Sequence, residues 1–167
     1  FGRIGRAFAR SVAGRDIEIV AINDLGSLEN LAYLLKYDTV YGRAPFSVEA
    51  KDGALYLDGR EVKFFSEKDP AQLPWKDLNI DVAVESTGVF TEYEKAKVHL
   101  AAGARRVVIT APAKEDSALV ATILMGINDE LCSSVSITSN GSCTTNAVRP
   151  VVAILDAALG IEKAILS

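Results

Sequence analysis

The sequence contains little cysteine or histidine. Among its 167 residues there are two cysteines, one histidine, one methionine and one tryptophan. Cys132 and Cys143 are too few for a disulfide framework, and no cysteine or histidine spacing typical of a metal site occurs. We therefore expect a reducing compartment, a cytoplasmic location and no metal.

Long apolar runs and an excess of basic residues are also missing. No apolar run approaches the roughly 18 residues that span a bilayer, and the first residues lack the pattern of a signal peptide. The net charge of -4 argues against nucleic acid as the main partner. We expect a soluble chain that does not enter a membrane.

Short apolar segments alternate with segments of helical periodicity. Helices are predicted over residues 2–12, 27–37, 92–104 and 143–160. Buried strands are predicted over residues 17–24, 81–87, 105–112 and 134–138. In the first helix the residues recurring at three- and four-residue spacing are Ile4, Ala7, Phe8 and Ser11.

Residues 46–66 follow a different pattern. Runs in which apolar and polar residues alternate are separated by the turn sequences "KDG" and "DGR". Such a pattern predicts antiparallel hairpins. The strands and helices elsewhere alternate, which predicts a doubly wound, mostly parallel sheet. The expected fold class is therefore α/β, a Rossmann-type domain with an antiparallel hairpin excursion.

The chain begins with a pattern typical of dinucleotide-binding helices. Gly2 and Gly5 are spaced as the second and third glycines of G-x-G-x-x-G, which let a helix N-terminus approach a pyrophosphate. Asp24 ends the next predicted strand, about where the motif has an acid that binds the adenosine ribose. This carboxylate would repel the 2′-phosphate of NADP, so NAD is favoured. The alternative is that Asp24 only caps a turn.

Cys143 begins the predicted helix 143–160. A free thiol has a pKa of about 8.5, and a helix N-terminus lowers the pKa and favours the nucleophilic thiolate. The backbone amides of Cys143, Thr144 and Thr145 could hold an oxyanion formed on an attacked carbonyl. The hydroxyls of Ser142 and Thr144 could bind a substrate phosphate.

The alternative for Cys143 is a small buried residue at a helix cap, as free cysteines often are. Cys132 lies in a predicted turn region and is expected to be inert. His99 is interpreted as a partly exposed helix residue and not as a base for Cys143.

Seven segments follow one another in an order that resembles phosphorylating glyceraldehyde-3-phosphate dehydrogenase: "FGRIGRA", "AINDL", "LLKYDTVYGR", "EKDPAQLPW", "DVAVESTGVFT", "VVITAP" and "SNGSCTTN". The resemblance covers essentially the whole chain, and Gly141 replaces the alanine of the family's usual last motif. The family protein is about twice as long. The resemblance implies that residues 1–167 are its NAD-binding domain with the catalytic cysteine loop and the following helix. The C-terminal catalytic domain would be absent, except for a first strand that begins at about residue 162.

The resemblance also implies a set of NAD-binding residues. Those around the pyrophosphate and adenosine would be Gly2, Arg3, Ile4, Gly5, Asp24 and Lys68. Those flanking the cofactor toward the nicotinamide would be Ser86, Thr87, Gly88 and Thr110.

In the implied mechanism, Cys143 attacks the aldehyde of glyceraldehyde 3-phosphate, hydride passes to NAD, and inorganic phosphate cleaves the thioester to 1,3-bisphosphoglycerate. Ser142 and Thr144 would bind substrate phosphate or inorganic phosphate. The histidine base would lie a few residues beyond Ser167, so the chain alone is expected to be inactive, and the full-length protein is expected to be a homotetramer. Two alternatives stay open, namely an erythrose-4-phosphate dehydrogenase, or a non-catalytic NAD-binding module if the 167 residues are the complete product.

Overall fold

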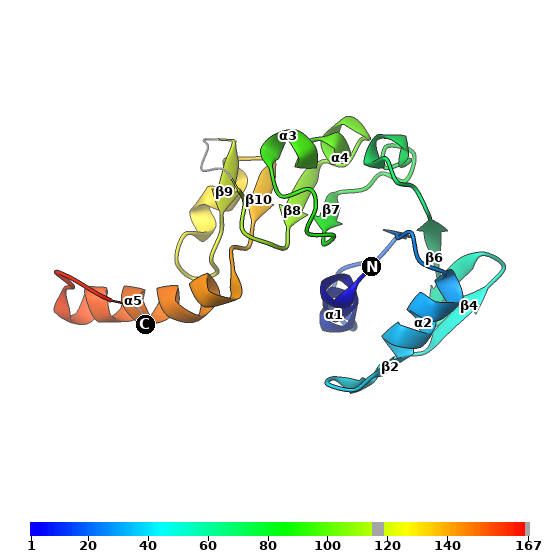
Figure 1. Ribbon diagram of the computed structural model, residues 1–167, viewed down its shortest axis with the longest axis horizontal. Helices are drawn as coiled ribbons and strands as arrows, with labels where there is room; N and C mark the ends of the chain where they lie inside the picture. The colour runs from blue at the N-terminus through cyan, green and yellow to red at the C-terminus, as the bar shows by residue number, and fades with distance from the viewer. Residues whose placement is uncertain (115–118, 166–167) are drawn as a thin grey trace.

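Parallel strands and the helices beside them build most of the molecule (Figure 1). The computed structural model describes residues 1–114 and 119–165. The helices are α1 (Arg3–Val12), α2 (Leu28–Lys36), η1 (Pro70–Gln72), α3 (Tyr93–Ala96), α4 (Val98–Ala101), η2 (Asp129–Ser133) and α5 (Cys143–Leu159). The strands are β1 (Ala21–Asn23), β2 (Tyr37–Asp38), β3 (Gly42–Arg43), β4 (Val48–Lys51), β5 (Ala54–Leu57), β6 (Arg60–Phe65), β7 (Val82–Glu85), β8 (Arg106–Ile109), β9 (Val120–Thr122) and β10 (Ile137–Ser139).

The strands form two four-stranded sheets. In the first sheet, of order β1-β6-β5-β4, β1 is parallel to β6 and the other pairs are antiparallel. These antiparallel pairs are the hairpins predicted for residues 46–66. In the second sheet, of order β7-β8-β10-β9, every pair is parallel. A short antiparallel pair, β2 and β3, follows α2.

The parallel strands are divided between the two sheets. In the described ranges, β1 pairs only with β6 and β7 pairs only with β8, so each lies at the edge of its sheet. The α/β class is confirmed, with the parallel strands divided between the two sheets.

Helix α1 lies between the two sheets (Figure 1). Its buried residues are Gly5, Ala9 and Val12, and Ala9 packs in the core of the first sheet. The helix was predicted correctly, but the spacing that begins at Ile4 does not mark its buried face, because Ile4 is 53% exposed. Gly5 lies against Ser86, in the loop that follows β7 of the second sheet.

Several predicted elements change at their ends. The strand predicted over residues 17–24 forms only as β1, because one edge alone has a partner. The helix predicted over residues 92–104 divides into α3 and α4 at Lys97. The strand predicted over residues 134–138 is β10, shifted toward the C-terminus by its pairing with β8 and β9. Strand β9 was not predicted.

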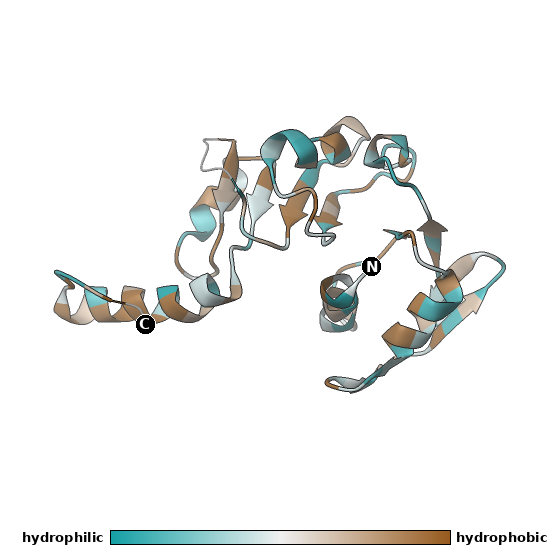
Figure 2. Ribbon diagram, in the orientation of Figure 1, coloured by the Kyte–Doolittle hydropathy of each residue, from teal (hydrophilic) through white to brown (hydrophobic). Residues whose placement is uncertain are grey.

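Helix α5 extends away from the second sheet (Figure 1), and apolar residues recur along it (Figure 2). Within the described part of the chain none of its residues is buried, and Val151, Ile154 and Leu159 are all more than half exposed. The strand predicted from about residue 162 does not form over residues 161–165, where no described strand offers a partner. Leu166 and Ser167 lie outside the described residues. No helix in the described ranges is long and apolar enough to cross a bilayer.

Gly103 joins α4 to β8 at a point where only glycine fits. Its φ is 111°, and a Cβ there would lie 2.5 Å from the Cβ of Lys76 and 2.6 Å from its backbone. We expect Gly103→Ala to lower the free energy of unfolding by more than about 1 kcal/mol, because strain and a backbone clash act together. Denaturant unfolding of the two proteins measures this. Gly53→Ala is the matched control, since Gly53 also has a positive φ but has open space around it; an equal loss in both variants would contradict the clash.

Candidate cofactor and thiol site

The N-terminus of α1 presents unpaired backbone amides. Gly2 is the N-cap, and the first helical hydrogen bond runs from the Arg6 amide to the Gly2 carbonyl at 3.0 Å. The amides of the three residues between them therefore lie in the first turn, where the helix provides no acceptor. The first turn carries no acidic residue. Such a helix start attracts an anion such as a pyrophosphate.

Gly5 brings this helix start against the loop that follows β7. A Cβ at Gly5 would lie 3.0 Å from the hydroxyl oxygen of Ser86 and 3.4 Å from the Phe1 ring. The absence of a side chain at Gly5 therefore allows α1 and the 86–88 loop to touch. The glycine spacing in the sequence indicated a close approach of this kind.

Asp24 follows β1 directly and carries a partly buried carboxylate. One oxygen accepts a hydrogen bond from the Gly26 amide at 2.8 Å. Asp24 is therefore a hydrogen-bond acceptor on the loop that follows β1.

Lys68 lies on the loop after β6, and this loop is tied to the end of β1. The Asn23 side chain accepts a hydrogen bond from the Glu67 amide at 2.8 Å and donates one to the Glu67 carbonyl at 3.0 Å. Lys68 is exposed next to this connection. Asn23 therefore holds the loop of Lys68 near Asp24, a role that the sequence analysis did not assign.

Glu85, the last residue of β7, contacts two of the predicted cofactor residues. Its carboxylate accepts hydrogen bonds from the backbone amide of Thr87, at 2.7 Å, and from the Thr87 hydroxyl. Its carbonyl accepts from the Thr110 amide at 2.9 Å and from the Thr110 hydroxyl at 3.1 Å. Glu85 was not among the predicted site residues. The one sequence feature that points to it is its position before the "STG" segment.

His99 corrects a prediction, because it is buried and not partly exposed. Only 7% of its surface is accessible, and Trp75 and Phe90 pack against its ring. Its Nδ1 accepts a hydrogen bond from the Trp75 indole at 3.1 Å, and its Nε2 lies 3.1 Å from Glu85. Helical periodicity could not reveal this, because the segment that covers His99 is distant in sequence.

The loop of residues 139–143, here called the cysteine loop, is anchored to the ends of β8 and β10. The Ser139 hydroxyl donates to the Ala111 carbonyl at 2.6 Å and accepts from the Gly141 amide at 3.0 Å. The Asn146 side-chain amide donates to the Asn140 carbonyl at 2.6 Å and to the Ser142 carbonyl at 2.9 Å. Helix α5 thus holds the loop from which it starts.

Cys143 is exposed and is the first residue of α5. Ser142 is the N-cap, and its hydroxyl oxygen accepts a hydrogen bond from the Thr145 amide at 3.0 Å. The same hydroxyl lies 3.1 Å from the Thr144 hydroxyl and 2.7 Å from that of Thr145. The cap therefore uses the oxygen of Ser142, while Thr144 stays exposed beside the thiol. The thiol therefore lies at the start of α5, where the sequence predicted it.

Gly141 has a φ of 69°, and a Cβ there would lie 3.3 Å from the Thr122 methyl group. Glycine adopts this left-handed conformation without strain. The residue that departs from the usual family motif therefore fits the backbone of the loop as it stands.

Contacts connect the predicted residues at one end of the strands. They run from Gly5 at the start of α1 to Ser86, and from Glu85 to Thr110. The Ser139 bond to Ala111 adds the cysteine loop. The Lys68 loop is connected to this edge through the Asn23–Glu67 hydrogen bonds, and Thr144 through its hydroxyl contact with Ser142. In the part of the chain that is described, no three metal-binding side chains gather to hold an ion.

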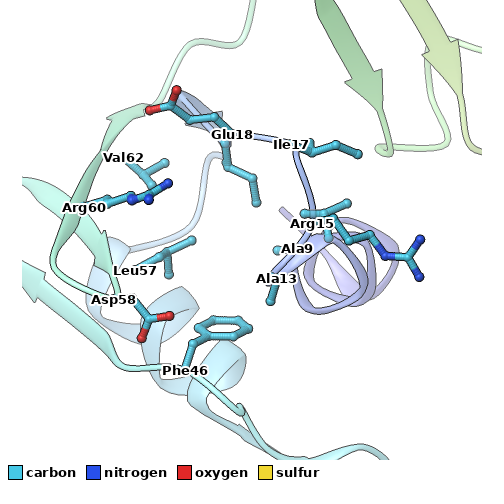
Figure 3. Close-up of a pocket in the computed structure, with 13 residues that line it drawn as sticks. Ala9, Ala13, Arg15, Ile17, Glu18, Phe46, Leu57, Asp58, Arg60 and Val62 are labelled. Atoms are coloured by element: carbon cyan, nitrogen blue, oxygen red, sulfur yellow. The ribbon is translucent and has the colours of Figure 1, made fainter.

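A cavity of about 480 Å³ lies elsewhere, at the amino ends of β1 and β6. Figure 3 shows Phe46, Leu57 and Val62 on one side of it, and Ala9 of α1 and Ala13, the C-cap of that helix, on the other. Its lining includes none of the predicted site residues. The candidate site rests on the strand ends and not on this cavity.

Comparison with known proteins gives a consistent result. The family model described as "Glyceraldehyde 3-phosphate dehydrogenase, NAD binding domain" matches residues 1–93. Similar curated proteins include the glyceraldehyde-3-phosphate dehydrogenases of Thermotoga maritima, 48% identical over 171 residues, and of Clostridium acetobutylicum, 47% identical over 169 residues. The cytosolic enzyme of Trypanosoma brucei brucei is 44% identical over 168 residues. Each match covers 100% of this chain and 50% of the relative, so the chain spans about half the length of these relatives.

The N-cap of α5 offers a test of how the thiol is held. We expect Ser142→Ala to lower the free energy of unfolding by about 1 kcal/mol, because the Thr145 amide loses its acceptor. We also expect slower alkylation of Cys143 at neutral pH, since the helix start is less ordered. Thermal unfolding and the rate of reaction with iodoacetamide measure the two effects. The control is Ser133→Ala on exposed η2; unchanged stability and alkylation in Ser142→Ala would contradict the role of the cap.

Proposed function

Because the chain belongs to the glyceraldehyde-3-phosphate dehydrogenase family, we propose that it forms the NAD-binding half of an enzyme that oxidises and phosphorylates glyceraldehyde 3-phosphate. The observation that carries this proposal is the position of Cys143. An exposed thiol at the start of a 17-residue helix lies on a loop that is bonded to the ends of the parallel strands. A nucleophile is thereby joined to the edge of the sheet where a dinucleotide binds.

The residues around this edge suit NAD. The free amides of Arg3 and Ile4 would face the pyrophosphate, together with the glycines at the start of α1. The carboxyl group of Asp24 would accept hydrogen bonds from the adenosine ribose, and Lys68 would lie near the adenine. The nicotinamide side would contact the 86–88 loop and Thr110. A bound NAD would accept the hydride that leaves the substrate.

The chemistry at Cys143 follows from its position. The thiolate sulfur bonds to the aldehyde carbon and gives a thiohemiacetal, whose oxygen the amides at the start of α5 would hold. Loss of hydride from that carbon leaves a thioester. Inorganic phosphate then attacks the thioester carbon, the carbon–sulfur bond breaks, and the thiolate returns. Thr144 and Ser142 would bind the phosphate groups.

His99 is not the base for this reaction, since both of its ring nitrogens are bonded inside the core. We place the base, and the rest of the substrate site, in the part of the relatives' length that the chain does not span. A C-terminal catalytic domain there would also cover the apolar residues of α5. We further propose that residues 1–167 act as one domain, and that the full-length protein is a cytoplasmic homotetramer.

Replacement of the thiol tests the proposal. In the full-length protein, Cys143→Ser should lower phosphate-dependent NADH formation by roughly a thousandfold or more, because the thioester cannot form. The dissociation constant for NAD should stay within about twofold, since the strand-end contacts remain. Cys132→Ser is the matched control, because Cys132 is also exposed but lies outside the site. Retained activity in Cys143→Ser would overturn the proposal, as would faster turnover of erythrose 4-phosphate by the unaltered enzyme.

The 167-residue chain by itself should form little or no NADH with glyceraldehyde 3-phosphate and phosphate. The reason is that the proposed base and half of the substrate site lie outside it. A spectrophotometric assay of the purified chain, beside the full-length protein, measures this. Turnover of the chain at a rate close to that of the full-length protein would refute the division of roles.

A further inference from the structure

We propose that three buried residues, Trp75, His99 and Glu85, position the 86–88 loop for NAD. We call them the buried triad. The inference rests on the proposed function, because the loop must first bind the cofactor. These are positioning residues: they act on NAD through Thr87 and do not touch it.

The buried triad is a continuous chain of hydrogen bonds inside the core. The three residues are 5–7% exposed. The Trp75 Nε1 lies 3.1 Å from the His99 Nδ1, and the His99 Nε2 lies 3.1 Å from the Glu85 Oε2. Trp75 comes from the segment after η1, His99 from α4 and Glu85 from β7. Three separate elements therefore meet at one line of polar contacts.

Trp75 fixes where the imidazole carries its proton. An indole nitrogen is a donor only, so the Nδ1 of His99 must be the acceptor. In the neutral ring the proton then lies on Nε2, which donates to Glu85. A second proton on Nδ1 would face the indole N–H and break that bond. The indole thus favours the tautomer of His99 that carries its proton on Nε2 and donates toward the loop.

The carboxylate of Glu85 accepts hydrogen bonds on both of its oxygens. His99 donates to one carboxylate oxygen, and the amide and hydroxyl of Thr87 donate to the other. Burial raises the pKa of Glu85, but the hydrogen bonds from His99 and Thr87 outweigh it and keep the pKa below its usual range. A carboxylate is an acceptor only, so all three donors suit an ionised Glu85.

The buried triad determines the conformation of the 86–88 loop. The hydroxyl of Thr87 donates to Glu85 and accepts from the Val89 amide at 3.1 Å, so the loop closes around it. Gly88 then takes a φ of 75°. Ser86, on the other side of Thr87, lies against Gly5 at the start of α1. Fixing Thr87 therefore fixes the loop relative to the amides proposed to face the pyrophosphate.

This arrangement cannot accept an amide in place of the carboxylate. In Glu85→Gln, the amide oxygen would accept from Thr87 and the NH₂ group would face the His99 Nε2. That nitrogen could accept only if the proton moved to Nδ1, where it would meet the Trp75 indole N–H. With either tautomer of His99, two hydrogen-bond donors therefore face each other, at Nε2 or at Nδ1. Trp75→Phe removes the indole donor and lets Nδ1 carry the proton.

The test is a double-mutant cycle in the full-length protein, read by the dissociation constant for NAD. We expect Glu85→Gln to weaken NAD binding about tenfold, because a buried donor loses its acceptor. Trp75→Phe should weaken it about threefold. The double variant should bind NAD more tightly than Glu85→Gln alone, since the conflict between donors is relieved. If the substitutions only damaged packing, the double variant would not bind NAD more tightly than Glu85→Gln.

The control is Leu73→Val, which trims the same core cluster and changes no polar atom. It should lower thermal stability and leave the dissociation constant for NAD unchanged. A double variant that binds NAD as weakly as the product of the single effects would overturn the proposal. So would an unchanged dissociation constant in Glu85→Gln.

A second measurement uses the unaltered protein without bound NAD. Nitrogen-15 NMR of histidine-labelled protein, with the His99 signals assigned by their loss in His99→Gln, should show that the ring carries its proton on Nε2 and leaves Nδ1 unprotonated. A ring protonated on Nδ1 would overturn the proposal. If the unaltered protein does not bind NAD, the proposed function fails, and the tautomer still shows whether the buried triad is ordered as described.

Discussion

The parallel register of the second sheet is the constraint on which the site depends. Glu85 of β7 pairs with Ile109 of β8, and Ile109 pairs with Ser139 of β10. Each is the last residue of its strand. The three strands therefore end side by side, and the residues that follow them lie at a common edge of the sheet. A slip of one residue in either pair would turn the carboxylate of Glu85 or the hydroxyl of Ser139 to the opposite face.

The two polar residues at these strand ends perform the same task by different means. Ser139 and Glu85 are both buried, and each bonds to the backbone of a segment that leaves the sheet. Ser139 holds the cysteine loop with a neutral hydroxyl, whereas Glu85 holds the 86–88 loop with a charge. Hydrogen bonds to a charged group are stronger than those between neutral groups. The loop beside the start of α1 is thus held by the stronger contact.

Sequence patterns could predict the residues that follow strands, because strand ends and glycine spacing are local features. Cys143 begins its helix as predicted, whereas Asp24, Thr87 and Thr110 lie just beyond the ends of β1, β7 and β8 and not inside the predicted strands. They could not predict the burial of His99, because the residues that cover it come from other elements. They also overestimated β1, since an apolar run does not tell how many of its edges have partners. The edge of β1 that faces β7 has none among the described residues.

The cost of burying Glu85 explains why its surroundings are so specific. A buried carboxylate is tolerated only when donors replace water on both oxygens, and here they come from one loop and one helix. The loop donors belong to Thr87 itself, so the charge is satisfied only when the loop has its observed shape. A loop that moved away would leave a buried charge short of two donors. The electrostatic penalty of the charge therefore opposes any other arrangement of the 86–88 loop, which an apolar residue at the end of β7 could not do.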